Sequence, residues 1–256
     1  MRNTQVEREA LEKQYYIESS TEGVSTESID LDLLTYKMWE ARAALEGLAR
    51  HEAMIRNAGT ILELGAGEGW LSCILKRKNP SATIVASDIS WDGIASNHRW
   101  AKVLAAQPDA VLACRSYEIP LADSSVDLVI VFSAGHHFGA QRRSLAEIYR
   151  VIRPGGAAVY MHEPTCPALL HKIAYRRVNA KRPAVVEDVL RFKKIAELGR
   201  SAGFGVDVVF APTTTCRAPL ETLYYSAHRR LRWLNRMLPC TADFVFTKPT
   251  NASISR

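Results

Sequence analysis

The chain has 256 residues, of which 47% are hydrophobic and 23% charged, enough to bury one full hydrophobic core and to exclude a disordered or fibrous protein. Its five cysteines form no Cys-x-x-Cys pair, which argues against a disulfide framework or a structural zinc site. The first residues are charged and no apolar run approaches the roughly 18 residues of a membrane-spanning helix, so we expect a cytoplasmic protein without a transmembrane segment.

The net charge of +6 conceals two opposite halves. Residues 1–128 hold 13 Lys and Arg against 19 Asp and Glu, a net charge of −6, whereas residues 129–256 hold 20 against 8, a net charge of +12. A basic half favours an anionic acceptor, an acidic membrane surface or a nucleic acid. The same charge distribution is also explained by charged side chains on ordinary solvent-exposed surfaces, with the two halves offsetting each other in net charge.

Residues 4–18 and 28–56 carry apolar side chains at helical spacing and are separated by a polar turn. They precede the first predicted strand, and we expect them to form an N-terminal helical cap over residues 1–58. The remainder, residues 59–256, is predicted to form one larger domain.

Residues 59–70 are predicted to run from a buried strand through a glycine turn into a helix. The apolar run from Ile61 to Leu64 is typical of a parallel strand covered on both faces. Gly65, Gly67 and Gly69 then allow positive φ angles and a close approach of the backbone to a ligand. The helix that follows, over residues 71–78, points its free N–H groups at that turn.

The next predicted strand, residues 83–88, ends on Asp88, which lies 23 residues beyond Gly65. A carboxylate at this position binds ribose hydroxyls in nucleotide cofactors. A nicotinamide dinucleotide is disfavoured, because the turn reads Gly-x-Gly-x-Gly and Trp70 stands where the dinucleotide motif has its third glycine.

The later part of the chain continues to alternate between helices and strands. Helices are predicted over residues 91–106, 144–153 and 184–202, and strands over residues 110–114, 127–132, 157–161, 206–210 and 243–248, the last two as a closing hairpin-like pair. Two segments exceed a minimal fold of this kind, residues 165–183 and 211–242. Ligands of α/β sheets lie outside the carboxyl ends of strands, so we expect the first segment, which leaves the fifth strand there, to contact a substrate.

Four groups of residues together resemble the class I S-adenosylmethionine-dependent methyltransferases: the glycine turn, Asp88-Ile89-Ser90, the loop with Pro120, Asp123 and Asp127, and the Arg-Val-Ile-Arg-Pro-Gly-Gly ending that follows His136-His137. Within this class the chain resembles the ubiquinone/menaquinone-biosynthesis-like branch, of methyltransferase domain 11 type. The resemblance covers residues 59–164, the implied cofactor-binding core. It implies a Rossmann-like, doubly wound, seven-stranded and mostly parallel α/β sheet, with insertions 165–183 and 211–242 on the acceptor side.

The resemblance implies S-adenosylmethionine as the cofactor. It places Glu63 near the amino group of the cofactor, Asp88 on the ribose hydroxyls and Ile89 against the adenine face. The implied cofactor-binding residues are Glu63, Gly65, Ala66, Gly67, Gly69, Asp88, Ile89, Ser116 and Ser133. The chain departs from the family at Arg115, where an acidic residue commonly accepts a hydrogen bond from the adenine amino group.

Methyl transfer to a hydroxyl benefits from a general base with a pKa near 7, and histidine is the natural choice. His136, His137 and His162 end predicted strands beside the expected methyl group, and we rank His136 first, then His162, then His137. Their spacing matches no metal-binding motif. Positioning alone can supply roughly 7 to 11 kcal/mol of the barrier, so we expect metal-independent, in-line transfer.

The sequence therefore predicts a methyltransferase acting on a small molecule, at oxygen first, with nitrogen and carbon open. An anionic or lipid-linked acceptor fits the basic half, and residues 226–238 have the spacing of a basic amphipathic helix that either binds an anionic membrane or packs on the protein. An RNA methyltransferase is disfavoured, because the fourth strand ends in Ser-Ala-Gly-His-His rather than Asp/Asn-Pro-Pro-Tyr/Phe. A non-catalytic cofactor-binding fold and a homodimer both stay open.

Overall fold

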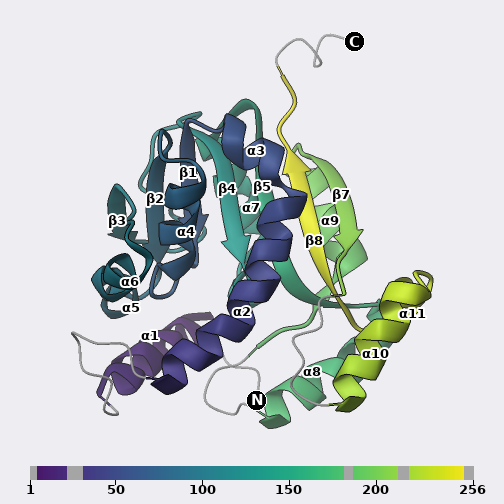
Figure 1. Ribbon diagram of the computed structural model, residues 1–256. Helices are drawn as coiled ribbons and strands as arrows, with labels where there is room; N and C mark the ends of the chain where they lie inside the picture. Colours follow the sequence, from purple (N-terminus) through teal and green to yellow (C-terminus); the bar gives the residue numbers. More distant parts are fainter. Residues whose placement is uncertain (1–4, 22–30, 182–186, 213–218, 251–256) are drawn as a thin grey trace.

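A computed structural model describes residues 5–21, 31–181, 187–212 and 219–250. Within these residues, one sheet has the strand order β3-β2-β1-β4-β5-β8-β7, and a short extra strand, β6, pairs with β5 (Figure 1). The strands are β1 (Thr60–Leu64), β2 (Thr83–Asp88), β3 (Ala110–Ala113), β4 (Val126–Phe132), β5 (Ile152–Cys166), β6 (Leu190–Arg191), β7 (Gly205–Phe210) and β8 (Cys240–Thr247).

Strands β1 to β6 pair in parallel, whereas β8 is antiparallel to both β5 and β7. The predicted seven-stranded, mostly parallel sheet and its closing antiparallel pair are thus confirmed, with β6 as an addition. Because β8 is the reversed strand, β7 runs in the same direction as β1 to β5. Its carboxyl end therefore lies at the same edge of the sheet as theirs.

Helices cover both faces of the sheet (Figure 1). One core cluster joins the strands to α2 (Leu31–Arg50), α3 (Glu52–Asn57), α4 (Trp70–Lys78) and α6 (Asn97–Leu104), and the other joins them to α7 (Gln141–Val151) and α9 (Phe192–Ser201). Adjacent residues such as Ile61 and Leu62 face opposite clusters and are both fully buried. That two-sided burial is why the strand appears in the sequence as a continuous apolar run.

The remaining helices lie at or near the carboxyl ends of the parallel strands (Figure 1). They are α1 (Gln5–Thr21), α5 (Trp91–Ala95), α8 (His171–Lys181), α10 (Pro219–Arg230) and α11 (Leu234–Met237). Both predicted insertions thus emerge at this edge, since residues 211–242 connect the carboxyl end of β7 to the start of β8. None of the helices in the described ranges combines the length and the apolar character needed to cross a bilayer.

Two predicted helices are each broken into two. The helix predicted over residues 28–56 divides at His51, whose backbone leaves the helical region and whose Nε2 atom lies 2.9 Å from the buried carboxylate of Asp243. The helix predicted over residues 91–106 divides at Ser96, whose backbone N–H bonds to the carbonyl groups of Gly93 and Ile94. In the first case a tertiary contact overrides local helical spacing.

Further boundaries were wrong. The strand predicted over residues 157–161 extends over Ile152–Cys166 and so contains His162, which had been expected to follow it. The helix predicted over residues 144–153 ends at Val151, and Pro154-Gly155-Gly156 belong to β5. The helix predicted over residues 184–202 begins only at Phe192, because the two preceding residues pair with the end of β5; residues 184–186 lie outside the described ranges. The amphipathic segment 226–238 is not one helix, since α10 ends at Arg230 and α11 begins at Leu234.

Candidate active site

The glycine turn adopts the backbone conformation that its composition predicts. Gly65, Gly67 and Gly69 have φ angles of 77°, 55° and 74°, a region that side chains with a Cβ atom rarely enter. A Cβ atom on Gly65 would also lie 2.7 Å from the Cβ atom of Ala134. The turn can therefore lie against the end of β4 only with glycine at position 65.

Asp88 closes the turn from the neighbouring strand. Its Oδ2 atom accepts the N–H of Gly67 at 2.8 Å, and its Oδ1 atom accepts the N–H of Ser90 at 2.9 Å. The carboxylate is buried, and burial raises its pKa to about 6 despite these two hydrogen bonds. Ala66, also buried, donates its N–H to the carbonyl of Ser87 at 2.8 Å. The predicted residues of the turn and of β2 thus form one hydrogen-bonded unit.

Glu63 lies at the end of β1, just before the turn, and is buried. The hydroxyl of Ser72, in the first turn of α4, donates a hydrogen bond to its carboxylate. Burial raises the pKa of Glu63 to about 8, the Ser72 hydrogen bond opposes this shift, and the nearby carboxylate of Asp88 adds to it. Burial therefore favours the protonated form of Glu63 at neutral pH.

Protonation of Glu63 has a measurable consequence for stability. A carboxyl group whose pKa is about 8 in the folded state, against an ordinary 4.5, binds more protons in the folded than in the unfolded state between these pH values. Relative to Glu63→Gln, the wild-type free energy of unfolding should therefore fall by roughly 1 kcal/mol per pH unit between pH 5 and 8. Urea unfolding of both proteins at pH 5, 6.5 and 8 measures this slope. If the difference in unfolding free energy between the two proteins did not change with pH, Glu63 would already be ionised at pH 5.

Helix α1 is attached to this region by ion pairs. Glu9 accepts hydrogen bonds from Arg115 Nε at 2.9 Å and from the hydroxyl of Tyr117 at 2.7 Å. Burial alone would raise the pKa of Glu9, but hydrogen bonds from Tyr117, Gln5 and Arg115 hold it below its ordinary value. Arg115, which replaces the family's acidic residue, thus holds a carboxylate that α1 brings to it.

Because Arg115 and Glu9 join α1 to the loop after β3, their pairing should control how readily the cofactor leaves. We expect Arg115→Glu to speed dissociation of S-adenosylmethionine about threefold, a modest effect because solvent screens this exposed ion pair. The charge swap Glu9→Arg with Arg115→Glu should restore the wild-type rate. Stopped-flow displacement measures these rates, and a swap as fast as the single variant would contradict the pairing.

The second part of the site lies at the end of β4, where residues 135–137 form a short 3-10 helix. The carboxylate of Glu163, fully buried, accepts backbone N–H groups from Ala134, Gly135 and His136 at 3.1, 2.8 and 3.0 Å. It also binds Nδ1 of His136 at 2.9 Å. Four contacts to one carboxylate fix both the backbone and the imidazole ring of His136. Glu163 therefore positions the His136 ring and the backbone at the end of β4.

His137 lies beside His136, with ring centroids 4.2 Å apart. Its Nδ1 atom is 3.0 Å from Oε1 of Glu12 in α1. Burial alone would lower the pKa of His137, but Glu12 raises it above the ordinary value, with smaller contributions from Glu187 and Glu163. One ligand atom each from His136, His137 and Glu187 lies within 4.8 Å of the others, so the structure gathers a group that their sequence spacing does not indicate.

His162 is separated from the other two histidines. Its ring stacks on Phe132 at 5.8 Å, and charges on Glu40 and Arg50 of α2 act on it. The backbone has a φ angle of 58°, and its N–H donates to Oδ1 of Asp243 at 2.9 Å. Burial lowers the pKa of His162 and so favours its neutral form, while the nearby carboxylate of Asp243 opposes this shift. It lies on the α2 side of the sheet, while Glu163, the next residue, faces His136.

Two predicted cofactor residues have their own local partners. The Ser116 hydroxyl lies 2.7 Å from the hydroxyl of Ser144 in α7. Ser133 has a φ angle of 49° and donates its N–H to the carbonyl of Met161 at 2.9 Å. The hydroxyl of Ser116 therefore already has a hydrogen-bonding partner in α7.

Sequence reasoning missed three residues of the site: Ser72, Glu12 and Glu187. Ser72 is nine residues beyond Glu63 and in the first turn of the helix, so a strand-turn-helix geometry could have paired them. Nothing in the sequence places Glu12 or Glu187 beside His137, because both come from segments far away in the chain.

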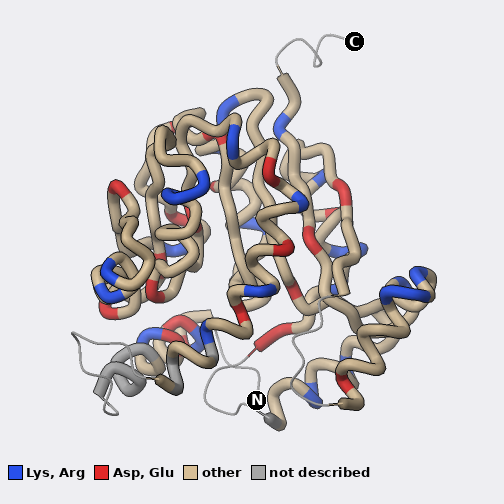
Figure 2. Tube along the Cα trace, in the orientation of Figure 1, with Lys and Arg blue, Asp and Glu red and all other residues tan. Residues whose placement is uncertain are grey.

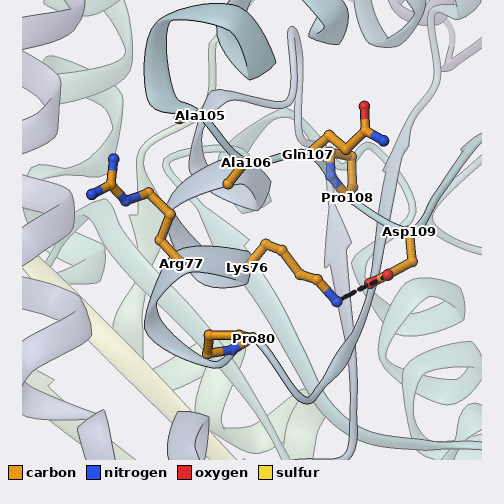
Figure 3. Close-up of a pocket in the computed structure, with 8 residues that line it drawn as sticks. All are labelled: Lys76, Arg77, Pro80, Ala105, Ala106, Gln107, Pro108 and Asp109. Atoms are coloured by element: carbon orange, nitrogen blue, oxygen red, sulfur yellow. Dashed lines mark hydrogen bonds and ion pairs between the residues drawn. The ribbon is translucent and has the colours of Figure 1, made fainter.

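A surface pocket elsewhere on the molecule is separate from this site (Figure 3). It is lined by Lys76, Arg77, Pro80 and residues 105–109. Lys76 Nζ lies 2.9 Å from the carboxylate of Asp109, which also accepts the N–H of Ile84 at 2.7 Å. The pocket lies at the opposite end of α4 from Gly69, and its paired charges tie that helix to the sheet.

Comparisons with known proteins agree with this geometry. Residues 62–160 match the model of a methyltransferase domain family. Demethylmenaquinone methyltransferase from Thermus thermophilus is 29% identical over 144 residues, which cover 55% of this chain and 62% of the relative. Malonyl-acyl-carrier-protein O-methyltransferase from Hahella chejuensis is 31% identical, over 77% of this chain and 66% of the relative. The matched part thus spans a little under two thirds of these relatives' length.

Among solved structures, phosphoethanolamine N-methyltransferase 2 from Haemonchus contortus, in complex with phosphomonomethylethanolamine and S-adenosylhomocysteine, has the same fold. The TM-score is 0.60 at 17% identity, with 81% of this chain and 52% of that chain covered. The sheet order, the glycine turn closed by Asp88 and these matches together show that the chain belongs to the class I S-adenosylmethionine-dependent methyltransferases of the UbiE-like type.

Proposed function

We propose that this protein is an enzyme that transfers the methyl group of S-adenosylmethionine to an oxygen atom of a small-molecule acceptor. The observation that carries the cofactor is the unit formed by the glycine turn and Asp88, which positions a buried carboxylate beside the turn that leads into α4. Asp88 would hold the ribose hydroxyls. Glu63, with its raised pKa, would ionise next to the cofactor's ammonium group.

The preference for oxygen rests on His136. The carboxylate of Glu163 accepts a hydrogen bond from Nδ1 of His136, which favours the tautomer with the proton on Nδ1. Nε2 is then left to accept a proton from an acceptor hydroxyl. The relatives' names include carbon, oxygen and nitrogen methyltransferases, so the family by itself does not select the atom. In-line displacement needs the acceptor atom about 3 Å from the methyl carbon, and positioning supplies most of the rate enhancement.

Two measurements test the proposal in sequence. Calorimetric titration with S-adenosylmethionine and S-adenosylhomocysteine establishes cofactor binding. Transfer of a deuterated methyl group is then assayed against matched hydroxyl, amine and activated-carbon acceptors, with the modified atom assigned by NMR. Methylation confined to amines or carbon would overturn the oxygen assignment, and absence of cofactor binding would overturn the enzyme.

We propose that the transfer does not use a metal ion, although His136, His137 and Glu187 lie close enough to share one. Each histidine already has a carboxylate beside its Nδ1 atom, and a sulfonium methyl group needs no Lewis acid to leave. Turnover should therefore be unchanged within about twofold after dialysis against a chelator. Loss of turnover that Zn²⁺ or Mn²⁺ restores would instead identify these three residues as metal ligands.

A further inference from the structure

The turn between α10 and α11, together with α11 itself, exposes three large apolar side chains. Leu231, Trp233 and Met237 are 46%, 58% and 59% exposed. Apolar side chains on a soluble surface are common when scattered, but three within seven residues form a patch. Tryptophan is also the side chain most typical of the boundary between water and lipid.

Four exposed arginines are interleaved with this apolar patch: Arg229, Arg230, Arg232 and Arg236. The acidic side chain within α10 and α11 is Glu221, which lies at the other end of α10. Figure 2 shows the basic residues gathered at the turn between these two helices, away from the body of the sheet. This corner therefore combines local positive charge with exposed apolar area.

The same surface continues along α10. Leu220 and Leu223 are 80% and 68% exposed, and Leu223 lies seven residues, or two helical turns, before Arg230 on the same side of the helix. Helix α8 lies next to α10 (Figure 1), and the charge of Arg177 in α8 acts on Tyr224 and Tyr225 of α10. Helix α8 adds exposed Ile173 and no acidic residue. We call the exposed side of α10 and α11 the basic-apolar face.

We propose that the basic-apolar face docks on the surface of an anionic lipid bilayer. Leucine, tryptophan and methionine side chains would enter the interface between headgroups and acyl chains, while arginines would bind lipid phosphates. A nucleic acid would use the arginines but leave the apolar side chains unburied. A second copy of the chain would bring two strongly basic faces together. A bilayer with anionic lipids is the partner that satisfies both the charge and the apolar area.

Docking in this way would bring the acceptor side of the fold towards the lipid. Helices α8 and α10 lie at the same end of the molecule as the carboxyl ends of the parallel strands (Figure 1). An acceptor carried in or on the bilayer would then reach the end of β4 without crossing bulk water. The docking proposal itself does not depend on the reaction or on the acceptor.

Vesicle flotation tests the proposal with the full chain. Vesicles of phosphatidylcholine with 30% phosphatidylglycerol should bind the protein at 0.1 M NaCl and release most of it at 0.5 M, whereas pure phosphatidylcholine should bind it weakly. Arg232→Glu with Arg236→Glu should lower binding at least about 25-fold, at about fivefold per lost basic charge. Trp233→Ala should lower it about tenfold through the lost apolar anchor.

The matched control is Lys193→Glu with Lys194→Glu on α9, two exposed side chains that give the same change in net charge away from the basic-apolar face. This control should keep at least half of the wild-type binding. Equal loss in both double variants, or no vesicle binding by the wild type, would overturn the proposal. So would a wild-type dimer that becomes monomeric in the arginine variant, or binding to RNA without binding to vesicles. Calorimetry with S-adenosylmethionine, expected to be unchanged in every variant, keeps this test separate from that of the enzyme.

Discussion

Replacing Asp88 by alanine is expected to weaken binding of S-adenosylmethionine by at least about 100-fold. Two hydrogen bonds from ribose hydroxyls to a carboxylate are each worth about 1.5 to 3 kcal/mol when desolvated, and alanine removes both. The substitution also removes the acceptor for the N–H groups of Gly67 and Ser90. The turn then loses one of the contacts that hold it against β2, while the N–H groups of Gly65 and Ala66 still bind the carbonyl of Ser87. Calorimetric titration of the variant and the wild type measures the change.

Asp88→Asn separates the two contributions, because its amide oxygen can still accept one backbone N–H while the charge is lost. We expect it to bind the cofactor about tenfold more weakly than the wild type and to unfold at a lower temperature, though by less than Asp88→Ala, because its amide NH2 group faces one of the two backbone N–H groups. The exposed carboxylate of Asp92, four residues further along the chain, provides the control in Asp92→Ala. Wild-type affinity in Asp88→Ala would place the cofactor elsewhere and remove the basis of the proposed enzyme.

The His136→Asn variant is expected to lower kcat by about 100- to 1000-fold while the KM for S-adenosylmethionine changes less than about threefold. A general base typically contributes a factor of this size, and a loss confined to kcat indicates a group that acts in the transition state. Asparagine is chosen because its side-chain amide can still donate to Glu163, so the buried carboxylate keeps a partner. Steady-state kinetics with the acceptor identified by the methylation assay provide the measurement.

His98→Ala is the control, because His98 is an exposed histidine of α6, outside both predicted insertions and not at the end of β4, with Nδ1 3.0 Å from the carbonyl of Ala95. Its kcat should remain within about threefold of wild type. A comparable loss in His162→Ala but not in His136→Asn would transfer the role of base to the α2 side of the sheet. A fall in melting temperature that parallels the loss of kcat would mean that His136 is structural.

The strands, the glycine turn and the acidic residue beside that turn were determined by local sequence features. The glycines of the turn are required by three positive φ angles, and the acidic end of β2 follows from the need for an acceptor beside that turn. The strands were predictable because a strand that is buried on both faces appears in the sequence as a continuous apolar run. These features depend on residues that are close together in the sequence, so they can be predicted from the sequence alone.

Boundaries set by distant partners were not predictable in this way. Helical spacing continues through residue 51, yet the helix breaks there because His51 binds a buried aspartate on β8. The two residues before Phe192 become a strand because the end of β5 offers hydrogen-bonding partners. In both cases the decisive energy comes from a segment more than 20 residues away, which local propensity does not record.

On the acceptor side, too, some features were predictable from the sequence and others depended on distant partners. The sequence by itself located His136 and His137 just beyond the fourth strand, because strand ends can be located from apolar runs, whereas His162, expected to follow the fifth strand, lies inside β5. Only the tertiary structure decided that Glu163 fixes His136, that Glu12 and Glu187 approach His137, and that His162 turns to the other side of the sheet. The physical reason is that side-chain pairing depends on distances across packed elements, whereas a sequence records only the order in which those elements occur.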